Sequence, residues 1–222
     1  MELGNIILSN SIQIEHFTVN PFAENTYVLM KDEKAVVFDP GFFHQSEYEK
    51  FYELLREHNA ELIAIILTHA HIDHVLGVQT LRNRYKVPVY LGDEDRYFWD
   101  NFVTQAQMFG FDAQPFNFEP QMLGPQEDWE IGPFTFDVRH TPGHAPCHLV
   151  FYMKEEKILI GGDTIFLDSI GRTDLYRGDF KLLEESIREK IYTLPDETKV
   201  YPGHGPETTI GYEKKHNPYV RV

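Results

Sequence analysis

Four ligand-type side chains lie within six positions of one another in residues 68–74, whose sequence is THAHIDH. The segment follows a run of apolar residues, 62–67, which predicts a strand that is buried on both faces. Imidazole nitrogens and carboxylate oxygens are the ligands that zinc and iron take in proteins. Because three imidazoles and a carboxylate in one turn would be costly to bury without a cation, the segment predicts part of a metal site.

The spacing within this segment indicates how its side chains are shared between ions. His69 and His71 are two residues apart, which places both imidazoles on one face of an extended strand end. Asp73 and His74 follow where the chain turns toward a helix, so they can face a neighbouring position. The spacing therefore indicates two metal ions, or one ion beside a vacant second position.

Three later segments repeat the order of strand, glycine or proline turn, and ligand-type residue. They are residues 141–144 (TPGH), 161–163 (GGD) and 202–205 (PGHG). Glycine lets the backbone approach an ion or substrate closely, and strand ends are rigid supports for ligands. Four motifs that each offer His or Asp indicate one shared site. Five other histidines are interpreted as ordinary core or surface residues, namely His16, His44, His58, His140 and His216.

Residues 69–74 resemble the HxHxDH signature of the metallo-β-lactamase superfamily, and the three later segments resemble its later motifs in the same order. Residues 169–175 (SIGRTDL) and 205–211 (GPETTIG) are similar to the glyoxalase II branch, especially its short bacterial hydroxyacylglutathione hydrolase-like members. The resemblance covers nearly the whole chain. It implies a layered α/β fold, the αββα sandwich, in which two mixed sheets are flanked by helices and the metals lie at one edge of the sheets.

The same resemblance implies two adjacent metal sites of three ligands each, joined by a bridging carboxylate. The implied ligands are His69, His71 and His144 for the first ion, Asp73, His74 and His204 for the second, and Asp163 for the bridge. The ions in such proteins are usually zinc, with iron or manganese in some members. We therefore expect two divalent cations as cofactors.

The expected reaction is the hydrolysis of a small-molecule thioester or ester of the hydroxyacylglutathione type. A water that bridges two dications becomes strongly acidic, and even one zinc can bring the pKa of bound water to ~7. The resulting hydroxide would attack the carbonyl, whose oxygen one ion would polarise. Asp73 is predicted to orient the nucleophile or accept its proton, in addition to its role as a ligand. Arg172 resembles a basic substrate contact in the same loop of the branch.

Other activities of the same fold are alternatives to this hydrolase. Persulfide dioxygenases share a similar Gly-Arg-Thr-Asp loop but use one iron, for which His71, His144 and Asp163, or His69 as a substitute, would be the matching ligands. The end at residues 202–206 (PGHGP) favours the hydrolase. A nuclease or an esterase is less favoured. A β-lactamase is not expected, because the loop 169–175 is of the glyoxalase type.

Composition sets the broad class of the protein. The 222 residues are 42% hydrophobic and 25% charged, which suits one globular domain over residues 1–222. A net charge of −15 argues against a nucleic-acid partner. The single cysteine, Cys147, excludes an internal disulfide and suits a reducing compartment. Because residues 1–12 lack the features of a signal peptide and no window is apolar enough to span a membrane, we expect a cytoplasmic protein.

An aromatic-rich insertion is expected at residues 93–126. Trp99, Phe102 and Ala106 share one helical face, which predicts a helix over residues 93–109 and then an irregular connection. The segment is interpreted as a helix packed on the core. A lid over the site or a homodimer face is the alternative, because aromatic residues and Met are enriched at such surfaces. Residues 87–91 predict a short strand at a sheet edge because they contain Pro88.

Overall fold

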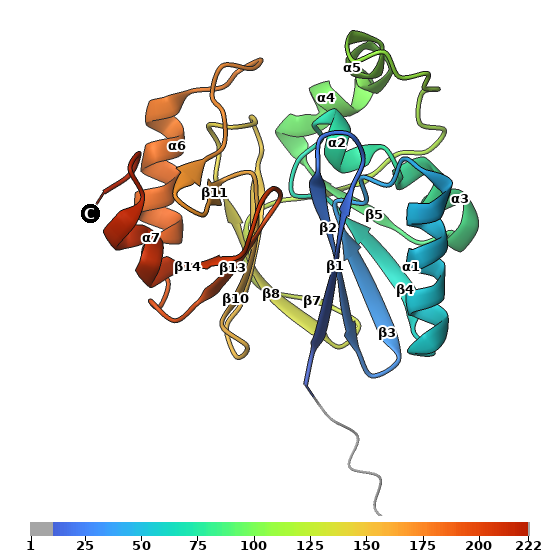
Figure 1. Cartoon of the computed structure of the whole chain (residues 1–222), viewed down its shortest axis with the longest axis horizontal. Coiled ribbons are helices and arrows are strands. Elements are labelled where there is room, and N and C mark those ends of the chain that lie inside the picture. The colour runs from blue at the N-terminus through green and yellow to red at the C-terminus, as the bar shows by residue number, and fades with distance from the viewer. Residues whose placement is uncertain (1–10, 222) are drawn as a thin grey trace, which may run out of the picture.

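Two six-stranded sheets form the centre of the protein, and helices cover their outer faces (Figure 1). The structure is a computed structural model that describes residues 11–221. We expect no signal peptide in residues 1–12, but residues 1–10 lie outside the described residues. No helix within residues 11–221 is long and apolar enough to cross a membrane.

The first sheet begins with three antiparallel strands, β1 (Gln13–Val19), β2 (Glu24–Lys31) and β3 (Lys34–Phe38). It continues with three parallel strands, β4 (Glu61–Ile66), β5 (Val89–Gly92) and β6 (Gln121–Leu123). The prediction that β5 is an edge strand is wrong, since it lies between β4 and β6. Pro88 precedes the strand, so its missing N–H interrupts no ladder within β5.

The second sheet begins with an antiparallel meander of four strands, β7 (Gln126–Ile131), β8 (Phe134–His140), β9 (Leu149–Met153) and β10 (Ile158–Gly162). Beside β10 lie a parallel strand, β13 (Lys199–Pro202), and an antiparallel one, β14 (Thr208–Thr209). A separate small hairpin consists of β11 (Ile165–Phe166) and β12 (Ser169–Ile170). Both large sheets are therefore mixed, as the sequence predicts.

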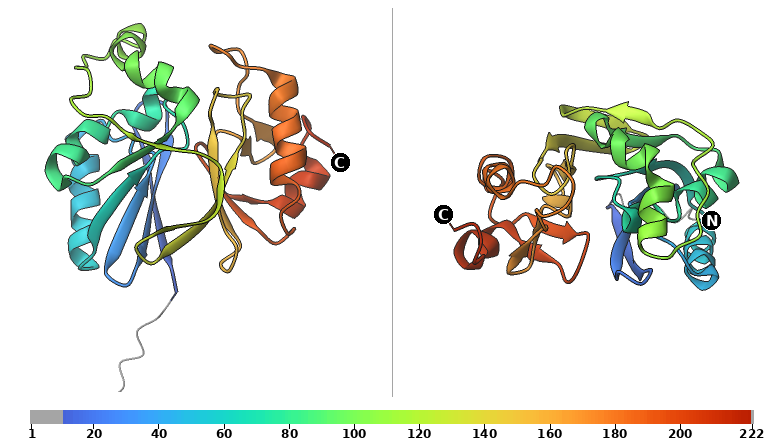
Figure 2. Two further views of the ribbon diagram at one scale, coloured as in Figure 1. Left: turned by 180° about the vertical axis from the view of Figure 1, so that it is seen from behind. Right: turned by 90° about the horizontal axis from the view of Figure 1, so that it is seen from above.

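Three apolar layers hold the sandwich together. Between the sheets, the ring of Phe38 contacts those of Phe136 and Phe151, with centroids 5.7 and 5.1 Å apart. The helices on the first sheet are α1 (Gln45–Glu57) and α3 (Val78–Tyr85). Those on the second are α6 (Phe180–Ser186), the π-helical turn η2 (Ile187–Ile191) and α7 (Ile210–His216). Figure 2 shows both helical layers from behind and from above. The expected αββα architecture is confirmed.

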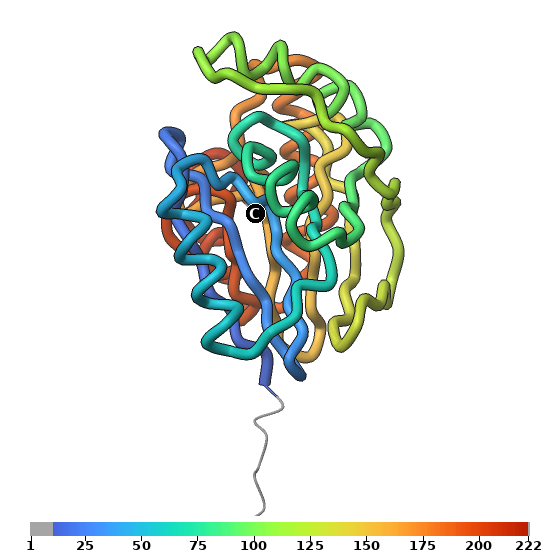
Figure 3. Tube along the Cα trace, turned by 90° about the vertical axis from the view of Figure 1, so that its right-hand side faces the viewer, coloured from blue at the N-terminus to red at the C-terminus, as the bar shows by residue number. Residues whose placement is uncertain are grey.

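The insertion lies at one end of the sheets, above α2 (Ile72–Val75) (Figures 1 and 3). The single helix predicted over residues 93–109 is wrong, because the chain forms a 3₁₀ turn, η1 (Asp93–Asp95), and two short helices, α4 (Arg96–Asp100) and α5 (Phe102–Met108). The break falls at Asn101, whose φ of −99° and ψ of 20° are not helical. The ring of Phe116 stacks on those of Trp99 and Phe102, with centroids 3.8 and 4.4 Å apart. The irregular connection thereby packs onto the two helices.

Candidate metal centre

Strand ends and turns from both sheets supply the side chains of the candidate site. His69 and His71 lie in the turn after β4, and Asp73 and His74 lie on α2. His144 comes from the turn between β8 and β9. Because β10 and β13 run parallel, the residues that follow them, Asp163 and His204, emerge at the same end of the second sheet.

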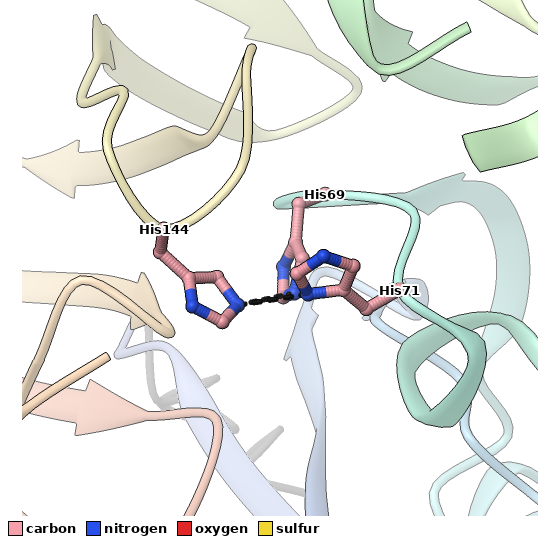
Figure 4. Close-up of side chains that lie close together, drawn as sticks. All are labelled: His69, His71 and His144. Carbon is pink, nitrogen blue, oxygen red and sulfur yellow. Dashed lines mark hydrogen bonds between the residues drawn. The ribbon is translucent and has the colours of Figure 1, made fainter. Parts of the chain in front are cut away.

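The first triad, defined as His69, His71 and His144, is buried and converges on one point (Figure 4). Nε2 of His144 lies 2.9 Å from Nδ1 of His71 and 3.2 Å from Nε2 of His69. One nitrogen from each ring lies within 4.8 Å of the other two. Three imidazoles that face each other at these distances form a donor set for a single cation.

The second triad, defined as Asp73, His74 and His204, lies beside the first. Oδ2 of Asp73 is 3.1 Å from Nε2 of His204 and 3.6 Å from Nε2 of His74. Asp163 lies between the triads, since its Oδ2 is 3.5 Å from Nε2 of His144 and 3.6 Å from Nε2 of His204. The structure therefore brings all seven predicted ligands together and places Asp163 at the position expected of a bridge.

Three of the ligand histidines, His144, His204 and His74, have hydrogen-bond partners on the ring nitrogen that points away from the centre. Nδ1 of His144 donates to the carbonyl oxygen of Arg172 at 2.8 Å, and Nδ1 of His204 donates to that of Ala23 at 3.2 Å. Nδ1 of His74 donates to Oδ2 of Asp39 at 3.1 Å. These bonds direct the Nε2 atom of each ring at the centre, as the hydrogen-bond partners of metal-binding histidines do.

The first triad is electrically neutral. Burial lowers the pKa of each of its histidines, and the pKa of His71 falls to about 3 through burial and the neighbouring His144. Neutral imidazole is the form that binds a metal ion. The first triad thus presents lone pairs without first having to release protons at neutral pH.

The second triad attracts positive charge. Burial alone would lower the pKa of His74, but the carboxylates of Asp73 and Asp163 raise it well above its usual value. Burial alone would raise the pKa of Asp163, but the charge on His74 holds it far below its usual range. His74 Nε2 and Asp163 Oδ1 are buried and have no hydrogen-bond partner within residues 11–221. A divalent ion would satisfy both atoms and supply the charge, so the donor sets fit divalent metal ions.

Asp39 is a supporting residue that the sequence does not mark. Its carboxylate follows β3 and accepts the backbone N–H of Thr68 at 2.7 Å, the Thr68 hydroxyl at 2.6 Å and the ring of His74 at 3.1 Å. Asp39, His69 and His74 also have ligand atoms within 4.8 Å of one another. Because His74 directs Nδ1 at Asp39 and Nε2 at the second triad, Asp39 acts as the support of His74.

His148 supports Asp163, the residue that lies between the two triads. Its Nε2 accepts the backbone N–H of Asp163 at 2.9 Å, and its ring stacks on His69 with centroids 4.9 Å apart. Cys147 has a different environment. Burial raises the pKa of its thiol to about 11, and it belongs to none of the candidate ligand groups within residues 11–221.

The peptide between His69 and His71 is held by two side chains of the insertion. The N–H of Ala70 donates to Oδ2 of Asp95 at 2.8 Å, and Nε2 of Gln105 donates to the Ala70 carbonyl at 3.1 Å. The other oxygen of Asp95 accepts the N–H of Cys147 at 2.9 Å, on the turn that carries His144. Burial raises the pKa of Asp95 to about 6. The insertion thereby orients both turns of the first triad.

Two motif glycines are required by close approaches. A Cβ on Gly203 would lie 2.2 Å from Oδ1 of Asp163. Gly162 has a φ of +47°, and a Cβ there would lie 2.5 Å from the Thr68 hydroxyl.

The stretch around Gly203 joins the two sheets. Asn25 donates its backbone N–H to the Gly203 carbonyl at 2.8 Å and its side-chain amide to the Gly205 carbonyl at 2.8 Å.

A cavity of about 530 Å³ opens above the two triads and has His71, Asp73, His144, Asp163 and His204 among its lining residues. Aromatic side chains of the insertion and of the loop 171–178 form its outer part. A larger and more open groove of about 730 Å³ between β8 and α6 touches none of the seven ligand residues. The chemistry therefore belongs to the smaller cavity.

Residues 19–204 match the family described as the metallo-beta-lactamase superfamily. The chain is 36% identical over 218 residues to the hydroxyacylglutathione hydrolase GloC of Haemophilus influenzae, a match that covers 94% of this chain and 98% of GloC. Its fold is similar to the crystal structure of the BLEG-1 B3 metallo-beta-lactamase, with a TM-score of 0.84 and 38% identity over 95% of this chain and all of that one. It is also similar to TTHA1623 in a di-iron-bound form, with a TM-score of 0.83 and 36% identity over 93% of this chain and all of that one. The chain belongs to the metallo-β-lactamase superfamily of metal-dependent hydrolases.

Proposed function

We propose that the protein hydrolyses a small-molecule thioester at a centre of two divalent ions, zinc in the first instance. The observation that carries the proposal is the position of Asp163, whose carboxylate oxygens lie 3.4 to 3.6 Å from ring nitrogens of both triads. A carboxylate shared by two donor sets is suited to holding two ions close together. The similarity to a hydroxyacylglutathione hydrolase over nearly the full length of both chains supports the thioester as substrate class.

We propose separate roles in hydrolysis for the bound ions and for Asp73. When bound, the two ions supply an acidified water and polarise the carbonyl oxygen. Burial alone would raise the pKa of Asp73, but the charge on His74 holds it below its usual range, so Asp73 is ionised at neutral pH. Its side chain is 14% exposed and lines the cavity. We propose that Asp73 orients the attacking water or accepts its proton.

The remaining steps need little more from the protein. A thiolate leaves without a strong general acid, since a thiol has a pKa of about 8.5 and its anion is therefore a weak base. Phe98 packs edge-on against His71, with ring centroids 4.6 Å apart, and keeps bulk water from that side of the centre. Arg172 lines the cavity beside His144 and is the proposed basic contact for the substrate.

The test is elemental analysis of the purified protein, followed by a thioester hydrolysis assay on the same sample. Two ions per chain and turnover are expected. Asp163→Ala and His71→Ala should lower metal content and activity together. His58→Ala is the matched control, because His58 is an exposed histidine at the end of α1 and should change neither quantity.

Two outcomes would refute the proposal. One is an alanine variant at Asp163 or His71 that keeps its metal and full turnover. The other is one iron per chain together with oxygen consumption on a persulfide, which would assign the dioxygenase reaction. A β-lactam belongs in the same screen because BLEG-1, a structural relative, is described as a metallo-beta-lactamase.

A further inference from the structure

We infer that the arm of the substrate that leads from the carbonyl to the mouth of the cavity is apolar and uncharged. The inference rests on the proposed thioester hydrolysis and narrows its substrate class. A thiol that carries two carboxylates, such as glutathione, would then be a poor partner. The preferred thiol would carry an alkyl or aryl group.

The outer part of the cavity is an apolar wall that extends into solvent. Met108 and Phe109, at the end of α5, are 78% and 52% exposed, and Tyr176 on the facing loop is 50% exposed. All three line the cavity together with Phe22 and Leu175. Exposed apolar side chains that continue the wall of a concave site mark a surface that binds an apolar ligand.

Contacts between aromatic rings fix the side chains of the apolar wall in place around the cavity. Tyr97 on α4 stacks on Tyr176, with centroids 4.0 Å apart and planes inclined by 20°. On another part of the wall, Phe22 meets Phe109 edge to face at 5.0 Å. The apolar surface is therefore formed before a ligand arrives, which lowers the entropy cost of binding an apolar arm.

The charged groups at the mouth are already paired, so the substrate contact proposed for Arg172 does not require a carboxylate on the thiol arm. Apart from histidines, Arg172 is the one basic residue that lines the cavity within the described part of the chain. Its Nε and Nη2 donate to the two oxygens of Asp174 at 2.7 and 2.8 Å. Arg177, in the same loop, donates to Glu94 at 2.8 Å. Two carboxylates of a thiol would have to compete with these acidic residues in a protein of net charge −15.

The amide side chains of the lining are also engaged. Nδ2 of Asn101 donates to the Tyr97 carbonyl at 2.8 Å, and Nε2 of Gln105 donates to the carbonyls of Ala70 and Phe98. These donors hold the backbone of the insertion. A charged arm would have to compete with these bonds for the amide donors, whereas an apolar arm leaves them in place.

The test uses three thioesters that share a lactoyl group, which is too short to reach the wall, so that only the thiol arm differs. The thiols are glutathione, its diethyl ester and 2-phenylethanethiol. We expect kcat/KM of the metal-loaded protein to rise in that order, by about tenfold from first to last, since the aryl arm buries apolar area on the wall. The second readout is calorimetric binding of the corresponding S-alkyl thioethers, which cannot be hydrolysed.

Variants locate the effect. Met108→Ser combined with Phe109→Ser should reduce kcat/KM for the phenylethyl thioester about tenfold, and change that for the glutathione thioester less than about twofold. Binding of the phenylethyl thioether should weaken in parallel. Met122→Ser is the matched control, because Met122 is an exposed methionine, at 42%, that does not line the cavity.

The outcomes separate this inference from the proposed function. Turnover of all three thioesters at equal rates, or fastest with glutathione, overturns the inference and leaves thioester hydrolysis standing. Absence of turnover with all three, together with thioether binding that the double serine variant weakens, refutes thioester hydrolysis and retains the apolar arm site. A double variant that changes the oligomeric state but not thioether binding also overturns the inference, because the wall would then be a protein interface.

Discussion

The two triads share Asp163 but differ in how charge is arranged around them. The first triad consists of three buried neutral imidazoles whose pKa values are lowered. The second combines a carboxylate with two histidines whose pKa values are raised, and its Asp73 and His204 side chains are 14% and 27% exposed. An ion at the second triad must therefore displace a proton, whereas an ion at the first does not. The comparison implies that the two positions differ in how strongly protons compete with the metal.

The largest effect is expected where the triads meet. Gly203→Ala would place a Cβ against Oδ1 of Asp163 and so displace the carboxylate shared by both triads. We expect metal affinity at both positions, and turnover, to fall by roughly a hundredfold. Gly124→Ala is the control, because nothing lies within 4 Å of a Cβ there. Retention of both ions in Gly203→Ala would show that Asp163 does not connect the triads.

Acid should separate the two positions. His74, with its raised pKa, takes up a proton as the pH falls, so affinity at the second triad should drop about tenfold per pH unit. His71, with a pKa of about 3, stays neutral until far lower pH, so the first ion should be retained at pH 5. Elemental analysis after dialysis at pH 7 and pH 5 measures the difference. Loss of both ions in one step would show that protons compete equally with the metal at both triads.

The supporting aspartates should act on one triad each. Asp39→Asn disturbs the partner of His74 and should weaken the second ion by about 10- to 100-fold. In Asp95→Asn, an amide NH₂ group would face a backbone N–H whose hydrogen bond the carboxylate accepts in the wild type. The variant should therefore bind the first ion more weakly and lose about 1–3 kcal/mol of folding stability. Titration of each variant with metal ions measures the affinity at each triad. Equal losses of affinity at both triads in one variant would contradict this prediction.

Asp95 also predicts a pH dependence of folding. Its pKa is raised from 3.8 to about 6 by burial, so the folded protein holds a proton that the unfolded chain releases between these values. The corresponding stability is present below about pH 4 and is lost as the pH rises through about 6. Urea unfolding of the metal-free protein at pH 4, 5 and 7 should show this slope in the wild type. The slope between pH 4 and 6 should be smaller in Asp95→Asn, and an unchanged slope there would assign it to other groups.

The smallest effect is expected at the rim. Arg177→Gln removes an ion pair with Glu94 whose side chains are 50% and 52% exposed. Exposed pairs contribute ~0–1 kcal/mol, so stability should change within that range and metal content should not change at either triad. Thermal unfolding and elemental analysis check both. A loss of metal would show that the rim influences the centre.

The sequence predicts those parts of the centre that follow a regular order along the chain. All seven ligand residues stand after apolar strands or in turns between them, so their types and order can be interpreted without coordinates. The residues that support the ligands, such as Asp95, cannot be recognised from the sequence in this way. Asp95 lies in the acidic run 93–95, which is typical of a surface turn, and becomes buried only because Ala70 and Cys147 approach it from distant parts of the chain.

Some features of the fold also cannot be predicted from the sequence, because they depend on contacts between distant residues. The order of apolar runs along the chain predicts the strands, and the family resemblance implies that they form two mixed sheets. The order of apolar runs does not predict the break of the insertion at Asn101, because the pattern of apolar positions continues across the break while Phe116 packs over both halves. The position of β5 inside the sheet depends on β6, a strand of three residues that carries little pattern of its own.

The hydrogen bonds between Asn25 and the stretch around Gly203 have a consequence for synthesis on the ribosome. Residues that the ribosome delivers nearly 180 positions apart must meet before the two sheets are joined. The two histidines of the 69–71 turn leave the ribosome well before His204, which lies far later in the chain. Since domains fold largely as units during synthesis, the second triad can form only after residues 202–205 have left the ribosome. A nascent chain therefore completes both triads only once the hydrogen bonds between Asn25 and this stretch can form.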